Sequence, residues 1–409
     1  MSKPILLMLL SRHPYAESSG RAVMIRQRIA QAKTAFDPTI IVFGAPAGDQ
    51  RDEGLTFLPL ANPSSIALNA LRLAERPLQT WLYHSAAARR EVARLAGERG
   101  AAAVYVDMLR LAPLAADVPS SVALIVDYDD LLSERYAQAA GKNYDVMGFL
   151  AKRVGPLAGV ARAVARPLLR SEAARCGRFE REMLKRADLV LFTSPREADA
   201  MRGGGAEVMA APPLIAPHAA APPPPGERLI FLGNMRYAEN VVMLRALAEA
   251  STALQAEGAL PDDAVIEVVG EHAPELPASF DAQRFRFLGR VDDLATLAGA
   301  GVFLAPVIGG SGVKLKVLDG MALGCPVVGT PKAREGLSAR VNRDLLIADD
   351  VKAVLAAAFK LRHRAELKQM LARRGRAYLE RAHAPAIGER VAEAMLAAVA
   401  RAEGRQETL

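Results

Sequence analysis

A proline-rich stretch, APPLIAPHAAAPPPPGE at residues 211–227, separates two long segments of similar pattern. So much proline is incompatible with a continuing helix or a central strand, and we expect a semi-rigid linker here. With 409 residues, the chain is also longer than one ordinary domain. The sequence therefore predicts two domains joined by this linker.

Each segment alternates short apolar runs with helical patterns, which is typical of an open parallel sheet covered by helices. The runs expected as buried strands in the first segment are 5–10, 39–43, 103–106, 122–126 and 189–192. Those in the second segment are 229–232, 264–269, 284–288, 302–305, 326–329 and 344–347. Helical patterns include 22–32, 86–98, 241–249, 293–298, 314–322, 351–361 and an alanine-rich tail at 384–405. We therefore expect an α/β protein whose two domains form a cleft, where ligands commonly bind.

The chain carries no sign of export or membrane insertion. The apolar run at 5–10 is shorter than the core of a signal peptide, and no small-residue cleavage site follows it. No run of about 18 apolar residues is present, so we expect no membrane span. Cys176 and Cys325 lie far apart and form no metal or redox motif. A reducing cytoplasm fits these features.

The stretch PVIGGSGVKLKVLDGMALG, residues 306–324, follows an expected buried strand and reads as a glycine loop leading into a helix. A helix N-terminus offers free N–H groups, and glycines allow a ligand to approach the backbone. Lys314 and Lys316 lie in the first turn, where cations oppose the helix dipole unless an anion binds there. A diphosphate is the simple candidate, with Asp319 suited to a sugar hydroxyl. The alternative is a tight turn with solvated lysines, and the stretch does not have the Walker pattern.

Several blocks in order resemble retaining family-four-type glycosyltransferases of the GT-B fold. GSGVKLKVLDGMALGCPVVGTPKAREGL is similar to their nucleotide-sugar-binding segment. FLGNMRYAENVVML, FLGRVDDLATLAGAGVFLAPV and HPYAESSGRAVMIRQ resemble three further blocks. VDYDDLLSERYA, RSEAARCGRFERE and LFTSPREADAM resemble a bacterial subgroup that assembles exopolysaccharides or other surface glycans.

The resemblance implies two Rossmann-like domains that face each other across a cleft, with a C-terminal helix that crosses back. It implies an acceptor-binding domain at 1–210, the linker at 211–227, a donor domain at 228–383 and the returning helix at 384–409. It also implies a nucleotide-diphosphate sugar as co-substrate, with UDP or GDP as the nucleotide, and no metal or other cofactor.

The donor residues implied by the resemblance lie in both halves. They are Gly20, Arg21, Arg236, Gly310, Ser311, Gly312, Lys314, Lys316, Asp319 and Glu335. The two lysines and the glycine backbone would hold the diphosphate, and Arg236 is a second anion partner. Asp319 would bind ribose or sugar, and Glu335 could do likewise. Each of these side chains has an ordinary structural alternative, such as a capped turn or a solvated helix surface.

This chain departs from the family pattern at three places. The usual glutamate is Asp319, the first glutamate of the family's paired motif falls at Ser311, and the usual segment before the linker is PPLIAPH. These changes concern the donor sugar rather than the fold.

The catalytic residues are predicted from one loop in the first half and one histidine. VDYDD ends an expected strand and carries Asp127, Asp129 and Asp130. We predict Asp127 or Asp130 as the base or as an acceptor ligand. The alternative is a solvated turn with one helix cap. His13, after the first strand, is a candidate contact for sugar or phosphate, or else a residue that holds its loop.

The net charge of +7 is concentrated in one segment. Residues 146–186 contain ten Lys and Arg residues against three Glu, which accounts for the whole excess. Arg162, Arg166 and Arg170 repeat every four residues and share one helical face. We expect this face to lie on an anionic membrane surface and to serve a lipid-linked glycan acceptor. The alternative is a solvated helical hairpin, and nucleic acid is disfavoured because no aromatic interleaving or known module accompanies the charge.

The sequence therefore predicts a cytoplasmic, peripheral membrane glycosyltransferase that acts in polysaccharide biosynthesis. Two alternatives stay open: a nucleotide-sugar epimerase of the same fold, and a non-catalytic glycan-binding protein.

Overall fold

The computed structural model describes residues 2–16, 20–141, 158–218, 226–261, 264–310 and 312–405, with the helix alone, and not its side chains, described at 158–165. The chain forms two compact units. The first comprises Met1–Pro213 and Ala386–Leu409, and the second comprises Leu214–Pro385. Part of the predicted linker, 219–225, and Ser311 lie outside the described residues.

The first unit is built on a parallel sheet of seven strands in the order β3-β2-β1-β4-β5-β6-β7. The strands are β1 (Ile5–Leu10), β2 (Asp37–Phe43), β3 (Leu55–Leu58), β4 (Ala101–Asp107), β5 (Ala123–Asp129), β6 (Leu189–Phe192) and β7 (Glu207–Ala210). The helices are α1 (Gly20–Ala35), α2 (Pro63–Arg72), α3 (Leu78–Tyr83), α4 (Ala86–Glu98), α5 (Leu132–Gly141), α7 (Ala158–Arg186), α8 (Pro195–Met201) and α13 (Pro385–Gly404), with 3-10 helices η1 (Gln50–Asp52) and η2 (Leu109–Ala115).

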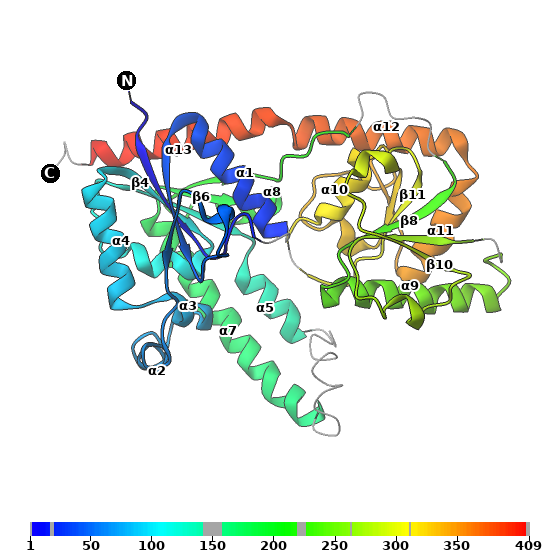
Figure 1. Cartoon of the computed structure of the whole chain (residues 1–409), viewed down its shortest axis with the longest axis horizontal. Helices are drawn as coiled ribbons and strands as arrows, with labels where there is room; N and C mark the ends of the chain where they lie inside the picture. Colours follow the sequence, from blue (N-terminus) through cyan, green and yellow to red (C-terminus); the bar gives the residue numbers. More distant parts are fainter. Residues whose placement is uncertain are drawn as a thin grey trace. The chain divides into compact units, whose positions relative to one another are not determined.

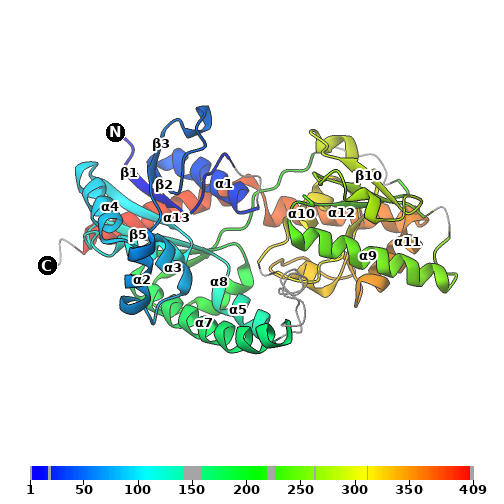
Figure 2. The ribbon, with the colours of Figure 1, turned by 60° about the horizontal axis from the view of Figure 1, so that its bottom comes forward.

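Alternating residues of the strands fill a core on each face of this sheet. Leu6, Met8 and Leu10 of β1 pack with α1 and with Met395 of α13. Leu7 and Leu9 belong to the opposite core, which also contains residues of α4 and α7. Figure 1 shows α13 lying along this unit, and Figures 1 and 2 show α5 and α7 side by side as a hairpin. The predicted return of the C-terminal helix to the first domain is confirmed.

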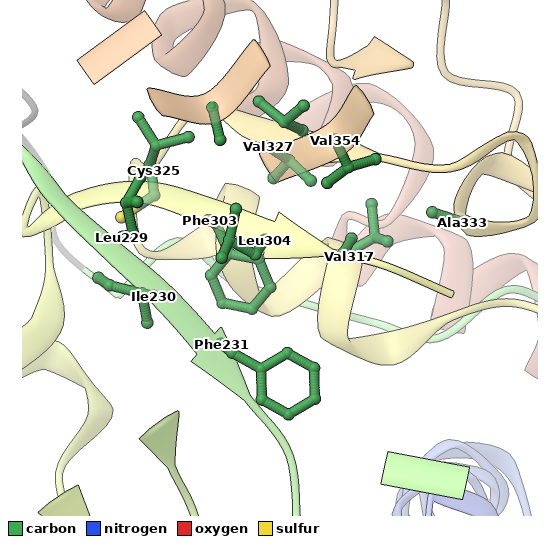
Figure 3. Packing of buried hydrophobic residues seen from close by; sticks show 14 of the residues in the cluster. Leu229, Ile230, Phe231, Phe303, Leu304, Val317, Cys325, Val327, Ala333 and Val354 are labelled. Carbon is green, nitrogen blue, oxygen red and sulfur yellow. The ribbon is translucent and has the colours of Figure 1, made fainter. Parts of the chain in front are cut away.

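The second unit has a parallel sheet in the order β10-β9-β8-β11-β12-β13. Its strands are β8 (Arg228–Leu232), β9 (Ile266–Val269), β10 (Phe285–Gly289), β11 (Gly301–Ala305), β12 (Val327–Gly329) and β13 (Leu346–Ile347). Its helices are α9 (Ala238–Ala256), α10 (Leu315–Ala322), α11 (Val351–Arg362) and α12 (Ala365–Ala382), with 3-10 helices η4 (Pro277–Ser279), η5 (Leu294–Leu297) and η6 (Pro331–Arg334). Figure 3 shows side chains of β8 and β11 packing with Val317 of α10 and Val354 of α11.

The predicted fold class, two parallel α/β units of Rossmann type, is confirmed. The pattern at 293–298 proves to be the 3-10 helix η5, with N–H groups of Thr296 and Ala298 donating to carbonyl oxygens three residues earlier. The short strands β3 and β7 were not expected; each has four residues and only partial burial.

Candidate functional site

The second unit has a topological switch point between β8 and β11. From β8 the strand order runs one way to β9 and β10, and from β11 the other way to β12 and β13. The loops that follow these two neighbouring strands therefore diverge at the carboxyl edge of the sheet. Open parallel sheets bind ligands at such a point. The loops after β8 and β11 contain most of the predicted donor residues.

The glycine loop after β11 takes backbone conformations that side chains disfavour. Gly310 and Gly312 have φ of 85° and 68°. Lys314 is the N-cap of α10, and its Nζ donates to the carbonyl oxygen of Gly312 at 2.8 Å. A Cβ built on Gly310 would lie 3.7 Å from the same ammonium. The predicted lysine and glycine backbone are thus together at the start of α10.

Lys316 lies in the first turn of α10 and is held by residues of β8 and α9. Its Nζ donates to Oδ1 of Asn240 at 2.7 Å and lies 4.9 Å from the ring centroid of Phe231. Burial lowers the pKa of this lysine to about 8, against the opposing effect of Glu239 and Asp319. A cation with little water around it interacts strongly with an incoming anion.

Asp319 is on α10, three residues after Lys316. Burial raises its pKa to about 7, although Lys316 acts to lower it. Among the described residues its carboxylate has no hydrogen-bond or ion-pair partner within contact distance. This carboxyl group is suited to a hydroxyl ligand, as predicted for ribose or sugar.

The loop after β8 is tied to α9 through an asparagine that the sequence analysis did not assign to the site. Nδ2 of Asn240 donates to the carbonyl oxygen of Asn234 at 2.7 Å, while its Oδ1 accepts from Lys316. Gly233 makes room for this side chain, since a Cβ there would lie 2.9 Å from Cγ of Asn240. The motif FLGNMRYAEN contains Asn240, so the resemblance was the available signal.

Arg236 is in the same loop but points to solvent. Its side chain is 67% exposed and pairs with Glu271 at 2.8 Å. Glu335 ends η6 and pairs with Lys332. The next residue, Gly336, packs on the glycine loop, because a Cβ there would lie 3.1 Å from Gly312 and Val313. The structure therefore brings the Glu335 segment to the glycine loop, whereas Arg236 is paired with Glu271 and largely exposed.

The first unit contains a buried network of arginines and carboxylates at the carboxyl edge of its sheet. Arg21 of α1 contacts Oδ1 of Asp107 through Nε at 2.8 Å and Oδ1 of Asp127 through Nη1 at 3.3 Å. Nε of Arg28 donates to Oδ2 of Asp127 at 2.9 Å, and the Tyr105 hydroxyl donates to the same oxygen at 2.8 Å. The network clamps α1 onto β4 and β5.

Asp127 is fully buried in this network. Burial acts to raise its pKa, but Arg21, Arg28 and the Tyr105 hydroxyl together hold it at about 2. A carboxylate with these partners is a poor proton acceptor. Arg21 is only 8% exposed. Both residues therefore have the surroundings of structural ions rather than of groups that meet a substrate.

Asp129, two residues further, has a different environment. Its φ is 65°, although it is not glycine. Its backbone oxygen accepts from both N and Oγ1 of Thr193, at 3.1 and 2.7 Å, which holds the unusual conformation. The side chain is 23% exposed and lies 3.1 Å from Arg21. Burial, with Asp130 and Asp127 nearby, raises its pKa to about 6 despite Arg21.

Of the three carboxylates in VDYDD, Asp129 is therefore the one suited to meet a substrate. Asp130 is 2% exposed and pairs with Arg135 at 2.5 Å. The sequence predicts Asp127 or Asp130 instead, because alternation along a strand does not reveal a left-handed residue at its end.

His13 is 7% exposed, and both ring nitrogens have partners. Its Nδ1 accepts from the backbone N–H groups of Tyr15 and Ala16 at 3.1 Å, so Nε2 carries the proton donated to Asp52 at 2.8 Å. The histidine holds its own loop, the alternative recognised from the sequence. Gly20 is the exposed first residue of α1.

Residues 158–186 of the basic segment form the long helix α7, and the rest of the segment lies outside the described residues. Arg166 and Arg170 are exposed on it, and Arg162 lies in the first turns, where side chains are not described. Among the described residues, no helix is both long and apolar enough to cross a membrane. In the same part of the chain, no group of three or more His, Cys, Asp or Glu is placed to hold a metal ion.

Comparison with known proteins gives a family match for part of the chain. Residues 226–363, which lie within the second unit, match the model of the family described as Glycosyl transferases group 1. A comparison with curated protein sequences finds no significant match.

Solved structures resemble the whole chain in fold. Sucrose-phosphate synthase from Thermosynechococcus elongatus has a TM-score of 0.61 at 15% identity, with 96% of this chain and 98% of that chain covered. A glycosyltransferase from Rickettsia africae ESF-5 has a TM-score of 0.58 at 13% identity, covering 97% and 99%. Anabaena Alr3699/HepE in complex with UDP and glucose has a TM-score of 0.59 at 13% identity, covering 96% and 100%.

At these identities the likeness concerns the fold, which is the GT-B fold of glycosyltransferases. The prediction of a glycosyltransferase is confirmed at the level of this fold and of the matched domain. The chain has the fold of GT-B glycosyltransferases, and residues 226–363 of its second unit match the glycosyl transferases group 1 family.

Proposed function

We propose that the protein transfers a sugar from a nucleotide-diphosphate sugar to a lipid-linked glycan acceptor, as a step in surface or exopolysaccharide assembly. UDP or GDP is the nucleotide, and Anabaena Alr3699/HepE, which has the same fold, is known in complexes with UDP and with UDP-glucose. The reaction proceeds with retention at the anomeric carbon and without a metal ion. The exposed arginines of α7 hold the enzyme on an anionic membrane.

The observation that carries this proposal is the placement of Lys316. Its ammonium is largely removed from water at the switch point of the second sheet, beside the glycine loop and Lys314. Burying a cation is unfavourable unless an anion joins it. A diphosphate bound here would be held by Lys314, Lys316 and the backbone N–H groups at the start of α10, which stabilise the charge that develops on the leaving nucleotide.

The acceptor side of the proposal rests on the first unit. Asp129 is placed to accept a hydrogen bond from an acceptor hydroxyl, and Arg21 and Asp127 hold it there. Under retention, the leaving phosphate oxygen takes the hydroxyl proton as the sugar carbon passes to the acceptor oxygen and the bond to the diphosphate breaks.

The first test is thermal stability against UDP, GDP, ADP and their sugars. A ligand at 100 times its dissociation constant stabilises by about 2.7 kcal/mol. We expect one nucleotide to respond in the wild type, and the response to be lost in Lys314→Ala/Lys316→Ala. Lys360→Ala, an exposed lysine on α11, is the matched control and should respond normally.

Two outcomes would contradict the proposal. No response across the panel would remove the donor site. Conversion of the responding nucleotide sugar to its epimer, with no acceptor present, would instead establish the epimerase alternative.

A further inference from the structure

Helix α2 buries a polar residue and exposes apolar ones, the reverse of an ordinary surface helix. Its single buried residue is Asn69, whereas Leu68 and Leu71 are 43% and 80% exposed. A surface helix ordinarily directs its apolar residues to the core and its polar residues to water. Leu68 and Leu71 are three residues apart and share one face. That face is apolar and exposed.

This orientation is fixed by specific polar contacts. Nδ2 of Asn69 donates to the carbonyl oxygens of Trp81 and His84, at 2.9 and 2.6 Å. Nε1 of Trp81 donates to the carbonyl oxygen of Leu73 at 3.0 Å. The side chain of Asn62 caps the helix through N–H of Ser65 at 2.8 Å. The helix is therefore held with its leucines outward.

Two further leucines are exposed in the neighbouring segments. Leu60 and Leu82 are 48% and 47% exposed, and they lie close together because N–H of Ala61 donates to the carbonyl oxygen of Leu82 at 2.8 Å. We call Leu60, Leu68, Leu71 and Leu82 the outer leucine surface. These four are among the eleven large apolar side chains that are exposed in the described part of the chain, so exposure is concentrated in one short segment.

Helix α7 contacts the start of α3. N–H of Leu78, the first residue of α3, donates to Oε1 of Glu172 at 2.7 Å. Leu168 is one turn earlier on the same face of α7 and is 52% exposed. Arg166 and Arg170 flank it and are exposed. Figure 2 shows α2 and α3 next to α7 on one side of the first unit.

The charge around the surface indicates what covers it. Residues 158–171 contain no acidic residue, and residues 60–84 contain one, Glu75. Arg76 is paired with Glu182 of α7, and the exposed cations are Arg72, Arg166 and Arg170. Leucines rimmed by arginines fit an anionic lipid surface, where the apolar groups reach the acyl boundary and the cations meet headgroups. A second copy of this chain would bring the same arginines against one another.

We propose that α2, α3 and the adjoining part of α7 form the surface that seats the enzyme on an anionic membrane, with the outer leucine surface inserted at the acyl boundary. This inference rests on the membrane part of the proposed function. It adds an apolar anchor on α2, a different element from the one that carries the α7 arginines.

The experiment uses the full chain and vesicles of phosphatidylcholine with about one-third phosphatidylglycerol, a composition chosen to give a strongly anionic surface. Trp81 is the chain's only tryptophan, and its side chain joins α3 to the end of α2, so its emission reports binding without a label. We expect a shift to shorter wavelength and quenching by brominated lipid. The variant Leu68→Gln/Leu71→Gln should lower the partition coefficient on the order of 100-fold, roughly tenfold for each leucine.

Two controls separate insertion from other causes. Val242→Gln/Leu396→Gln removes exposed apolar groups elsewhere, 53% and 39% exposed, and should bind vesicles as the wild type does. Arg166→Glu/Arg170→Glu should weaken binding chiefly at low salt. The thermal response to UDP or GDP reports the donor site and should be unchanged in all three variants.

Equal partitioning of Leu68→Gln/Leu71→Gln and wild type would overturn the apolar anchor. If only the arginine variant then lost binding, a purely electrostatic membrane contact would remain, as in the proposed function. A concentration-dependent dimer that the leucine variant abolishes, with no vesicle binding by the wild type, would identify a second copy as the occupant and overturn the inference.

Discussion

Asp129 illustrates how a single residue can be more informative than the motif around it. A left-handed backbone conformation is unfavourable for aspartate. It persists only where the surrounding structure enforces it, and residues in such conformations cluster at functional sites. Here Thr193 and Asp127 supply the enforcing hydrogen bonds. The result leaves a partly exposed carboxylate at the edge of the buried network, in contact with Arg21.

Replacing Asp129 with Asn should separate function from stability. Asparagine tolerates a positive φ, so the backbone is retained. The pKa of Asp129 is raised from 3.8 to about 6, so its contribution to stability is present below pH 4 and lost as the pH rises through 6. Asp129→Asn should therefore be more stable than wild type at pH 7.5, by up to about 3 kcal/mol, and equal at pH 4.

The same variant should lose roughly 100-fold in sugar transfer, because the acceptor hydroxyl is no longer oriented by a carboxylate, with nucleotide affinity unchanged. Melting at the two pH values and turnover with the nucleotide sugar identified above are the measurements. Asp117→Asn, at an exposed carboxylate paired with Arg89, is the matched control. Full activity of Asp129→Asn would remove Asp129 from the site.

Lys316 should make nucleotide binding depend on pH. Its pKa of about 8 means that the free enzyme loses this cation as the pH rises through 8, whereas a bound diphosphate favours the protonated form. The dissociation constant for the nucleotide should rise about tenfold between pH 7 and pH 9, with uptake of a proton at the higher pH. Calorimetry in two buffers of different ionisation enthalpy measures this uptake. A flat affinity profile in wild type would contradict the assignment.

At the scale of elements, the position of α10 depends on close contact with β11. A Cβ on Gly320 would lie 2.6 Å from Cγ of Phe303, so only glycine permits this approach. Gly320→Ala should push α10 away from the sheet and cost about 1–3 kcal/mol. Because α10 also carries Lys316 and Asp319, nucleotide affinity should fall in parallel. Chemical denaturation and calorimetry test the two effects, and a loss of stability without a loss of affinity would show that the site tolerates the shift.

Most of the sheets could be predicted from the sequence because their central strands are buried on both faces. The predicted runs 5–10 and 189–192 coincide with β1 and β6, whose residues are almost all buried. The edge strands β3 and β7 face water on part of their surface, so their composition gives no continuous apolar run. The apolar pattern of a sequence reveals strands that are buried, and it does not reveal strands that pair at a partly exposed edge.

The candidate site also contains residues that the sequence could reveal and contacts that it could not. Lys314, Lys316 and the glycines lie within a few residues of one another in the chain, so local spacing could reveal them. Asp107 and Arg21 are 86 residues apart and meet only through the order of strands. No local pattern predicts such a contact, although Asp107 ends β4 and Asp127 lies near the end of β5, where side chains of neighbouring strands are expected to converge.

At the scale of the molecule, each unit has its own core, and the C-terminus contributes to the first. Val391, Met395 and Ala398 of α13 pack with β1 and α1, far from them in sequence. Arg405 reinforces this docking through an ion pair with Asp188 at 2.5 Å. The donor residues of the glycine loop belong wholly to the second unit.

This division predicts that the two units respond to different perturbations. Met395 is fully buried, so Met395→Ala should cost about 2–5 kcal/mol in the first unit alone. A nucleotide that binds the glycine loop should stabilise the second unit alone. Scanning calorimetry should therefore give two transitions, one lowered by Met395→Ala and the other raised by the nucleotide. A single transition that both perturbations move would instead mean that the units unfold together, so that a ligand held by one unit stabilises the other.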